Sequence, residues 1–231
     1  MGKAETWGRS PQMNSNVFDL SSIGTANYLL ALHSSSETLG VAVLDMQQPE
    51  ECIQSLIFPT GRQLSNNILN CIDEVLPKKR WKGIARLAVA TGPGSFTGLR
   101  LTIVMARTIA QQLGCQLDGI SSFQLMASRL SRNLSNKDQP FWITKTLKRR
   151  GIVGGKYKIE KSKINNSSNV TELLAPHLIR PDIILDPAIE AEENVKEDVR
   201  LLLKKSLAEH RNNVISDWSK ILPIYPTSPI C

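Results

Sequence analysis

The chain has 231 residues, of which 41% are hydrophobic and 21% are charged, so its composition excludes wholesale disorder. No apolar run approaches the roughly 20 residues that a membrane-spanning helix needs. The four cysteines form no C-x-x-C pair and exclude a disulfide scaffold, which favours a reduced, cytoplasmic environment. The length predicts one large domain or two small lobes that share a core.

The net charge of +7, from 28 Lys and Arg against 21 Asp and Glu, comes from one segment. Residues 137–163 contain nine basic and two acidic residues, and the rest of the chain is neutral. A localised basic patch can recruit a polyanion. The alternative is a solvated basic loop, which is the more common role of a charge run.

The first part of the chain predicts a sheet followed by a helix. Residues 1–26 are polar and without periodicity, and we expect a disordered extension there. Short apolar runs with short connections predict an antiparallel meander; its strands are Tyr28–Leu32, Leu39–Leu44 and Cys52–Phe58. Apolar residues at helical spacing then predict a helix over Arg62–Leu76, which Pro77 ends, and a buried strand follows over Ile84–Ala90.

A glycine-rich turn, Thr91–Gly98, joins this strand to a long apolar helix that ends at Gly114. Such a turn before a helix start can bind an anion, and the candidate residues are Gly92, Gly94, Ser95 and Thr97. A Walker loop would need Lys after the last glycine, where this chain has Leu99. The residues alone therefore favour a tight turn whose glycines permit close packing.

The second part of the chain gives weaker signals. A strand is predicted over Leu117–Ile120, and Ser122 is a candidate cap for a helix over Phe123–Leu130. Two short strands are expected within 141–161, around 149–151 and with Gly154-Gly155 as a turn, and 162–170 resembles a loop. The last expected elements are an edge strand over Ile179–Leu185, an amphipathic helix over Val195–Leu207 and a proline-rich tail over Leu222–Pro229.

No convincing catalytic or metal centre is visible in the sequence. The three histidines, His33, His177 and His210, form no metal-binding pair, and Ser95 lacks the G-x-S-x-G frame. His33 ends the first strand, where it could touch a ligand, although a hydrogen-bonded histidine is the favoured interpretation. The acidic residues between Asp182 and Glu193 could hold a metal, but a solvated cluster is favoured.

The segment Ala90–Arg100, ATGPGSFTGLR, resembles the signature of the TsaB (YeaZ) family. The surroundings agree at Leu29–Ser36, Gly40–Val43, Gln63–Leu76, Gly114–Ala127 and Leu222–Tyr225. The resemblance is strong over 27–130, weak over 131–217 and returns at the tail. It implies an α/β, actin/Hsp70-like (ASKHA) fold of two related lobes, 27–120 and 121–231, each a mixed sheet with packed helices.

The same resemblance implies a non-catalytic scaffold subunit. Such a subunit supports a TsaD-type threonylcarbamoyltransferase, which modifies a tRNA adenosine next to the anticodon, and a TsaE-type ATPase joins the complex. It implies contact with tRNA through the complex and a homodimer when the partner is absent. No cofactor is expected on this chain alone, although a nucleotide at the subunit junction is a candidate.

The resemblance places the contact with TsaD on the two helices Arg62–Leu76 and Ser95–Leu113. Both helices are apolar beyond a single stripe, and a helix that is apolar most of the way round must be covered on a second side. The expected contact residues are Leu64, Ile68, Leu69, Ile72, Leu99, Leu101, Ile103, Val104 and Met105. The alternative is that the chain itself covers these side chains.

Two departures from the family pattern stand out. His33 occupies the place of an aspartate that usually ends the first strand, and the usual Asp-Ala-Arg strand is replaced by the basic stretch Lys145–Lys158. One rival hypothesis is a superfamily enzyme, either metallopeptidase-like or ATP-hydrolysing. A second is a basic tRNA-binding module that uses Lys148, Arg149 and Arg150.

Overall fold

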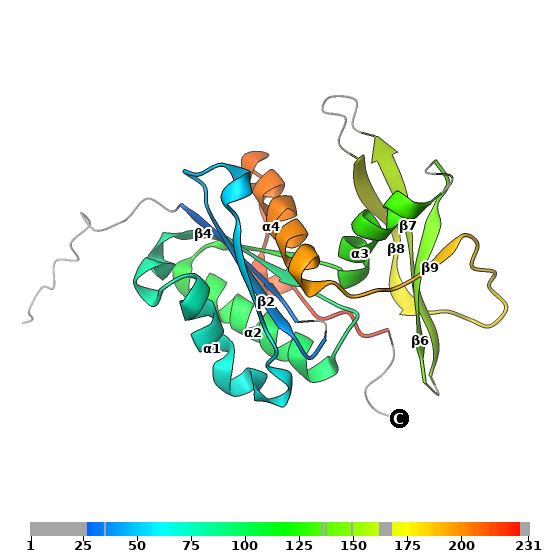
Figure 1. The fold of residues 1–231 in the computed structure, drawn as a ribbon, viewed down its shortest axis with the longest axis horizontal. Helices are drawn as coiled ribbons and strands as arrows, with labels where there is room; N and C mark the ends of the chain where they lie inside the picture. The colour runs from blue at the N-terminus through cyan, green and yellow to red at the C-terminus, as the bar shows by residue number, and fades with distance from the viewer. Residues whose placement is uncertain are drawn as a thin grey trace, which may run out of the picture.

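The computed structural model describes residues 27–34, 36–134, 136, 138–148, 150–161 and 168–226. Two β-sheets lie side by side, and helices pack on each of them: α1 (Leu64–Val75), α2 (Phe96–Leu113) and α4 (Val195–Arg211) on the first and α3 (Ser122–Leu130) on the second (Figure 1). The extension expected over 1–26 lies outside the described residues. Within the described part, no helix is both long and apolar enough to cross a membrane.

The first sheet has five strands in the order β3-β2-β1-β4-β5. Its strands are β1 (Tyr28–His33), β2 (Leu39–Asp45), β3 (Gln54–Phe58), β4 (Ile84–Ala90) and β5 (Gln116–Ile120). The first three pair antiparallel, which confirms the predicted meander, and β4 and β5 add to β1 in parallel. Strand β4 is apolar except for Arg86, because helices cover both faces of the sheet.

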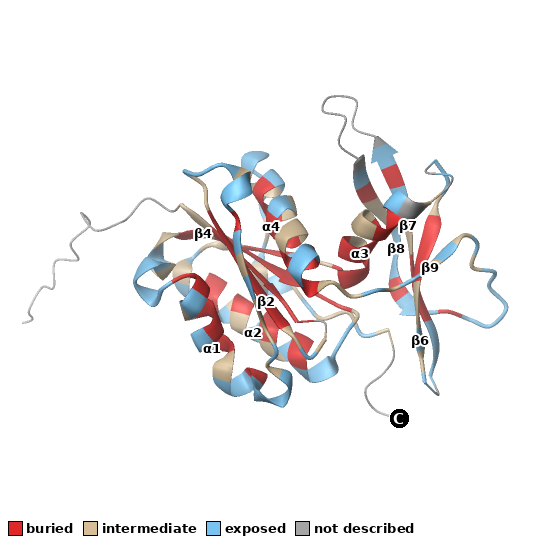
Figure 2. Cartoon of the chain, viewed as in Figure 1, coloured by how far each residue is buried: buried red, intermediate tan, exposed pale blue. Residues whose placement is uncertain are grey.

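Helices cover both faces of this sheet, and the sheet between them is largely buried (Figure 2). Helices α1 (Leu64–Val75) and α2 (Phe96–Leu113) pack on one face, and both were predicted from their spacing. Helix α4 (Val195–Arg211) packs on the other face, although it follows the second sheet in sequence. The predicted second lobe, 121–231, includes α4, which in space packs on the first sheet. The lobe boundary at residue 120 stays a prediction.

The second sheet has four strands in the order β8-β7-β6-β9. These are β6 (Phe141–Leu147), β7 (Gly151–Lys161), β8 (Ser168–Leu178) and β9 (Ala188–Glu190). Helix α3 (Ser122–Leu130) packs on one face, where Phe123 and Met126 meet Phe141 and Tyr157 in a separate core cluster. In Figure 1, α3 lies between α4 and this sheet, so it links the two lobes.

The expected turn at Gly154-Gly155 is wrong. Both glycines lie inside β7, and the connection of the hairpin falls between Leu147 of β6 and Gly151 of β7 instead. A Cβ at Gly155 would approach Tyr157 Oη to 2.6 Å, and one at Gly154 would approach Ile179 Cγ1 to 3.0 Å. These glycines therefore permit close packing within a strand.

Three further predictions in this region need correction. The loop expected over 162–170 includes the start of β8 at Ser168, and the strand expected over Ile179–Leu185 is not formed. Pro181 lacks the N–H that a strand ladder needs, and Ile184 is exposed. The N-cap of α3 is Ser121, whose hydroxyl accepts a hydrogen bond from Gln124 N, and not Ser122 as predicted.

Candidate functional site

The glycine-rich turn between β4 and α2 is held from both sides by backbone hydrogen bonds. The amide of Ile224 donates to Thr91 O at 2.8 Å, and the amide of Ser122 donates to Gly92 O at 2.7 Å. Gly92 has φ +95°, and a Cβ there would lie 2.7 Å from Leu99 Cδ1. The turn therefore has the packing role that the residues alone favoured, and it ties the C-terminal segment to the first lobe.

The exposed half of the turn borders a cleft of about 830 Å³ between the lobes. Gly94 and Ser95 line the cleft, Thr97 is exposed beside it, and Ser95 makes no side-chain capping bond to α2. Lys148 and Arg150 line the same cleft from the second lobe, while Arg149 lies outside the described residues. The fold thus brings the candidate anion turn and two of the three candidate tRNA contacts together, and binding at either stays a prediction.

Two aromatic side chains complete this cleft, and neither was predicted as a site residue. Phe96 and Tyr225 line the cleft with ring centroids 5.0 Å apart and a 40° interplanar angle. The Arg100 guanidinium lies 5.2 Å from the Phe96 centroid, in a cation–π contact. Phe96 stands inside the glycine motif, but nothing in the sequence joins it to Tyr225 near the chain end.

The charged side chains of the cleft come mainly from the second lobe. Lys145, Lys148 and Arg150 face two acidic residues of the lining, Glu37 and Glu193. The ammonium of Lys145 donates to Glu193 Oε1 at 2.9 Å, so that pair is internally balanced. The cleft therefore combines a partly neutralised basic wall with an aromatic pair.

The outer face of α1 and α2 is the second candidate site, and the structure corrects part of the predicted contact set. Five of its members are buried in the chain's own core, against the first sheet: Leu64, Ile68, Ile72, Leu99 and Ile103. Val104 is 59% exposed and Leu69 is 39% exposed, while Leu101 and Met105 are half-buried. Only these last four remain available to a partner, since helical spacing alone does not separate an inner from an outer apolar face.

His33 lies fully buried at the end of β1 and has no surface with which to touch a ligand. Burial lowers the pKa of its imidazole from 6.5 to about 4, and a backbone hydrogen bond opposes that effect. The ring is therefore a neutral core group near pH 7. This geometry supports the interpretation of His33 as a strand-end core residue.

Acid is expected to destabilise the chain through His33. Between pH 6.5 and 4 the unfolded chain holds the proton that the folded chain excludes, so stability falls as the pH is lowered across this window, by about 3 kcal/mol in total. Urea titrations at several pH values would give the slope of the unfolding free energy against pH for the wild type and for His33→Asn. The variant should lose the part of this slope that His33 contributes. Equal slopes for the two proteins would contradict the assignment.

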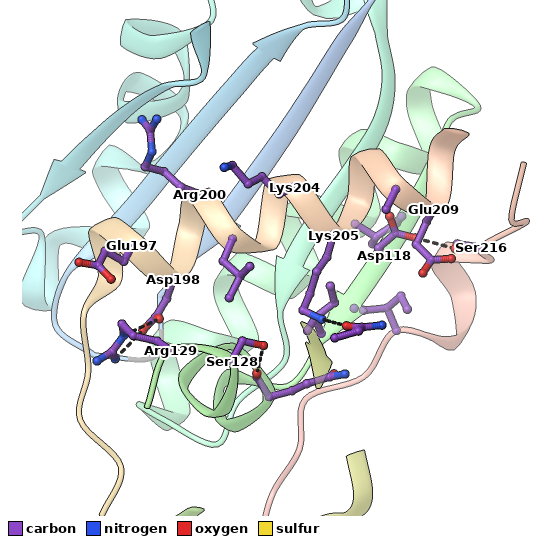
Figure 3. Close-up of a pocket in the computed structure, with 18 of the residues that line it drawn as sticks. Asp118, Ser128, Arg129, Glu197, Asp198, Arg200, Lys204, Lys205, Glu209 and Ser216 are labelled. Atoms are coloured by element: carbon purple, nitrogen blue, oxygen red, sulfur yellow. Dashed lines mark hydrogen bonds and ion pairs between the residues drawn. The ribbon is translucent and has the colours of Figure 1, made fainter. Parts of the chain in front are cut away.

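A larger hollow of about 1380 Å³ lies between α3, α4, β5 and the C-terminal segment (Figure 3). Its buried charges already have partners: Arg129 Nε lies 3.3 Å from Asp198 Oδ1, and Asp118 accepts from Ser216 Oγ at 2.6 Å. Lys205 donates to Asn169 Oδ1 at 3.2 Å. These side chains are therefore already engaged within the chain. Among the described residues, no group of three or more His, Cys, Asp or Glu side chains could hold a metal ion.

Comparison with known proteins identifies the family. The model of the TsaD family, tRNA N6-adenosine threonylcarbamoyltransferase, matches residues 58–176, just over half of the chain. The tRNA threonylcarbamoyladenosine biosynthesis protein TsaB of Buchnera aphidicola from Acyrthosiphon pisum is 26% identical over 160 residues, which cover 61% of this chain and 71% of that protein. TsaB of Bacillus subtilis is 28% identical over 102 residues, 43% of each chain. The chain belongs to the TsaB (YeaZ) branch of the TsaD family.

Solved structures agree with this fold. YeaZ from Pseudomonas aeruginosa aligns with a TM-score of 0.61 at 18% identity and covers 86% of this chain and 99% of that one. A second Pseudomonas aeruginosa structure, described as similar to peptidase YeaZ, aligns with a TM-score of 0.66 at 17% identity, covering 87% and 100%. These likenesses confirm the predicted α/β, actin-like fold of two lobes.

Proposed function

We propose that this chain is a non-catalytic scaffold subunit that binds a TsaD-type threonylcarbamoyltransferase and supports its modification of a tRNA adenosine next to the anticodon. Membership of the TsaB family places the chain in tRNA threonylcarbamoyladenosine biosynthesis. The proposal adds the role within that process. It includes a TsaE-type ATPase as a further partner, a homodimer when TsaD is absent, and no cofactor held by this chain alone.

The observation that carries the proposal is the apolar outer face of α1 and α2. Val104 exposes 59% of its surface in the middle of an 18-residue helix, and Leu101 and Met105 flank it on the same helix. Leu69 adds a further exposed apolar side chain from α1. Apolar side chains exposed on regular helices that already pack on a sheet are suited to a protein–protein contact.

Replacing Val104 by Glu is expected to weaken binding of the TsaD-type partner by at least tenfold, because a carboxylate would be desolvated at the centre of the contact. The measurement is co-purification from cells that express both chains, followed by calorimetric titration of the purified pair. The matched control is Ile184→Glu, which adds the same charge at a loop isoleucine that is 87% exposed and lies outside both helices.

Ile184→Glu should leave the affinity unchanged. Partner binding by Val104→Glu at the wild-type affinity would overturn the proposed contact. Ile68→Glu would not test it, because Ile68 is buried in the core and the variant would be expected to unfold.

A further inference from the structure

The aromatic pair of the interlobe cleft is suited to stacking. Phe96 and Tyr225 are each 39% exposed, although both also line the cleft, so part of each ring remains open to solvent. The position of Tyr225 is fixed by its neighbour, since Ile224 N donates to Thr91 O at 2.8 Å. Aromatic rings held on a rigid turn present a flat surface on which any nucleic-acid base can stack.

Basic side chains lie near this aromatic pair in both lobes. Arg100 lies against Phe96 from the first lobe, with its guanidinium 5.2 Å from the ring centroid. Lys145, Lys148 and Arg150 line the cleft from the second lobe. Lys145 is paired with Glu193, and the charged residue of the first-lobe lining is Glu37, so the other lining cations are Lys148 and Arg150, with Arg100 outside the lining beside Phe96. Cations spaced along one wall fit a backbone with several phosphates better than they fit a single phosphate group.

The basic segment found in the sequence has few aromatic residues of its own that a base could reach. Tyr157 is fully buried, and Trp142 is buried beneath Lys156, whose Nζ lies 5.4 Å from the indole centroid. The fold supplies accessible rings from elsewhere in the chain, at positions 96 and 225. The cleft of about 830 Å³ thus brings together the two features that binding of a single strand requires.

We propose that the interlobe cleft binds an unpaired segment of RNA, with a base stacked on Phe96 and Tyr225 and phosphates near Lys148, Arg150 and Arg100. This inference rests on the proposed function, in which the chain works beside a tRNA. It adds a direct contact between this subunit and a single-stranded part of that RNA.

The test is fluorescence anisotropy of the full chain with a labelled single-stranded RNA of about 12 nucleotides, within the 4–16 nucleotides that such grooves occupy. Tyr225→Leu is expected to weaken binding about tenfold, whereas Tyr225→Phe, which keeps the ring, should stay within about twofold. Equal loss in the two variants, or no loss in Tyr225→Leu, would overturn the stacking role. Thermal melts would show that both variants remain folded.

The basic wall has its own test. Lys148→Ala should lower the slope of log K against log salt by about 0.7, the value for one phosphate contact on a single strand. Lys158→Ala is the matched control, because Lys158 is an exposed lysine of the same hairpin that does not line the cleft. Equal slopes for wild type and Lys148→Ala would overturn the phosphate contact.

Free nucleotides and the partner distinguish the remaining outcomes. AMP and ATP at millimolar concentration should compete only weakly with the RNA. Competition as strong as that of unlabelled RNA would overturn the proposal of a single-stranded ligand and indicate a mononucleotide site. A wild-type chain that binds the TsaD-type partner but no RNA would overturn this inference alone. A chain that binds RNA but no partner would leave it standing and refute the scaffold function.

Discussion

Replacing Asp118 by Ala is expected to lower the free energy of unfolding by about 3–5 kcal/mol, because it leaves a buried guanidinium without its carboxylate. Arg86 on β4 and Asp118 on β5 are both buried in the first lobe. Two hydrogen bonds join them, from Arg86 Nε to Asp118 Oδ2 at 2.7 Å and from Nη2 to Oδ1 at 2.6 Å. This bidentate geometry is the strongest form of such a pair.

The same pair anchors the end of α4 and the segment that follows. Arg86 also donates to Val214 O at 2.7 Å and to Ser216 Oγ at 2.8 Å. Asp118 accepts from Ser206 Oγ of α4 and from Ser216 Oγ, each at 2.6 Å, and Figure 3 shows the latter bond. Removing the carboxylate therefore also loosens the packing of α4 and of the chain that leads to Tyr225.

Urea unfolding followed by circular dichroism would measure this loss of free energy, and a thermal melt should show a fall in Tm of about 10 °C for a chain of this size. The control is Asp182→Ala, which breaks the exposed pair between Arg180 Nη2 and Asp182 Oδ2, 3.5 Å apart. That variant should change stability by less than about 0.5 kcal/mol. A loss below about 1 kcal/mol for Asp118→Ala would show that water replaces the carboxylate.

The first lobe could be predicted from the sequence because its elements follow simple periods. Short apolar runs gave β1 to β4, helical spacing gave α1 and α2, and the glycine motif marked the turn between them. The second sheet was harder, since its long hairpin contains Gly154 and Gly155, which look like a turn but permit contacts with Ile179 and Tyr157. Such contacts join residues that no local pattern connects.

The candidate site, like the fold, could be predicted from the sequence only in part. The sequence marked the turn and the basic residues as separate features, and only the fold places Lys148 and Arg150 opposite Gly94 and Ser95. Tyr225 could not be found, because its place depends on a backbone bond across the lobe. The apolar helices were found, but their period is shared by the inner and outer faces, so core residues were included among the expected contacts.

Gly92→Ala is expected to destabilise the chain by about 2–5 kcal/mol, from a strained backbone and a steric clash together. A methyl group at Gly92 would lie 2.7 Å from Leu99 Cδ1 and 3.4 Å from Ile224 O, at a φ of +95°. Leu99 is buried in the helix that the turn begins, so it has little room to move. Urea unfolding would measure the effect.

Gly114→Ala separates the two causes. Gly114 ends α2 with φ +65°, and a Cβ there would meet nothing within 4 Å, so its replacement carries the backbone cost alone, about 1 kcal/mol. The excess loss in Gly92→Ala then measures the crowding against Leu99. If the two variants lost equal stability, the turn would tolerate a side chain at position 92. Packing against Leu99 would then not explain the glycine next to Thr91, whose carbonyl accepts from Ile224 N and so positions Tyr225.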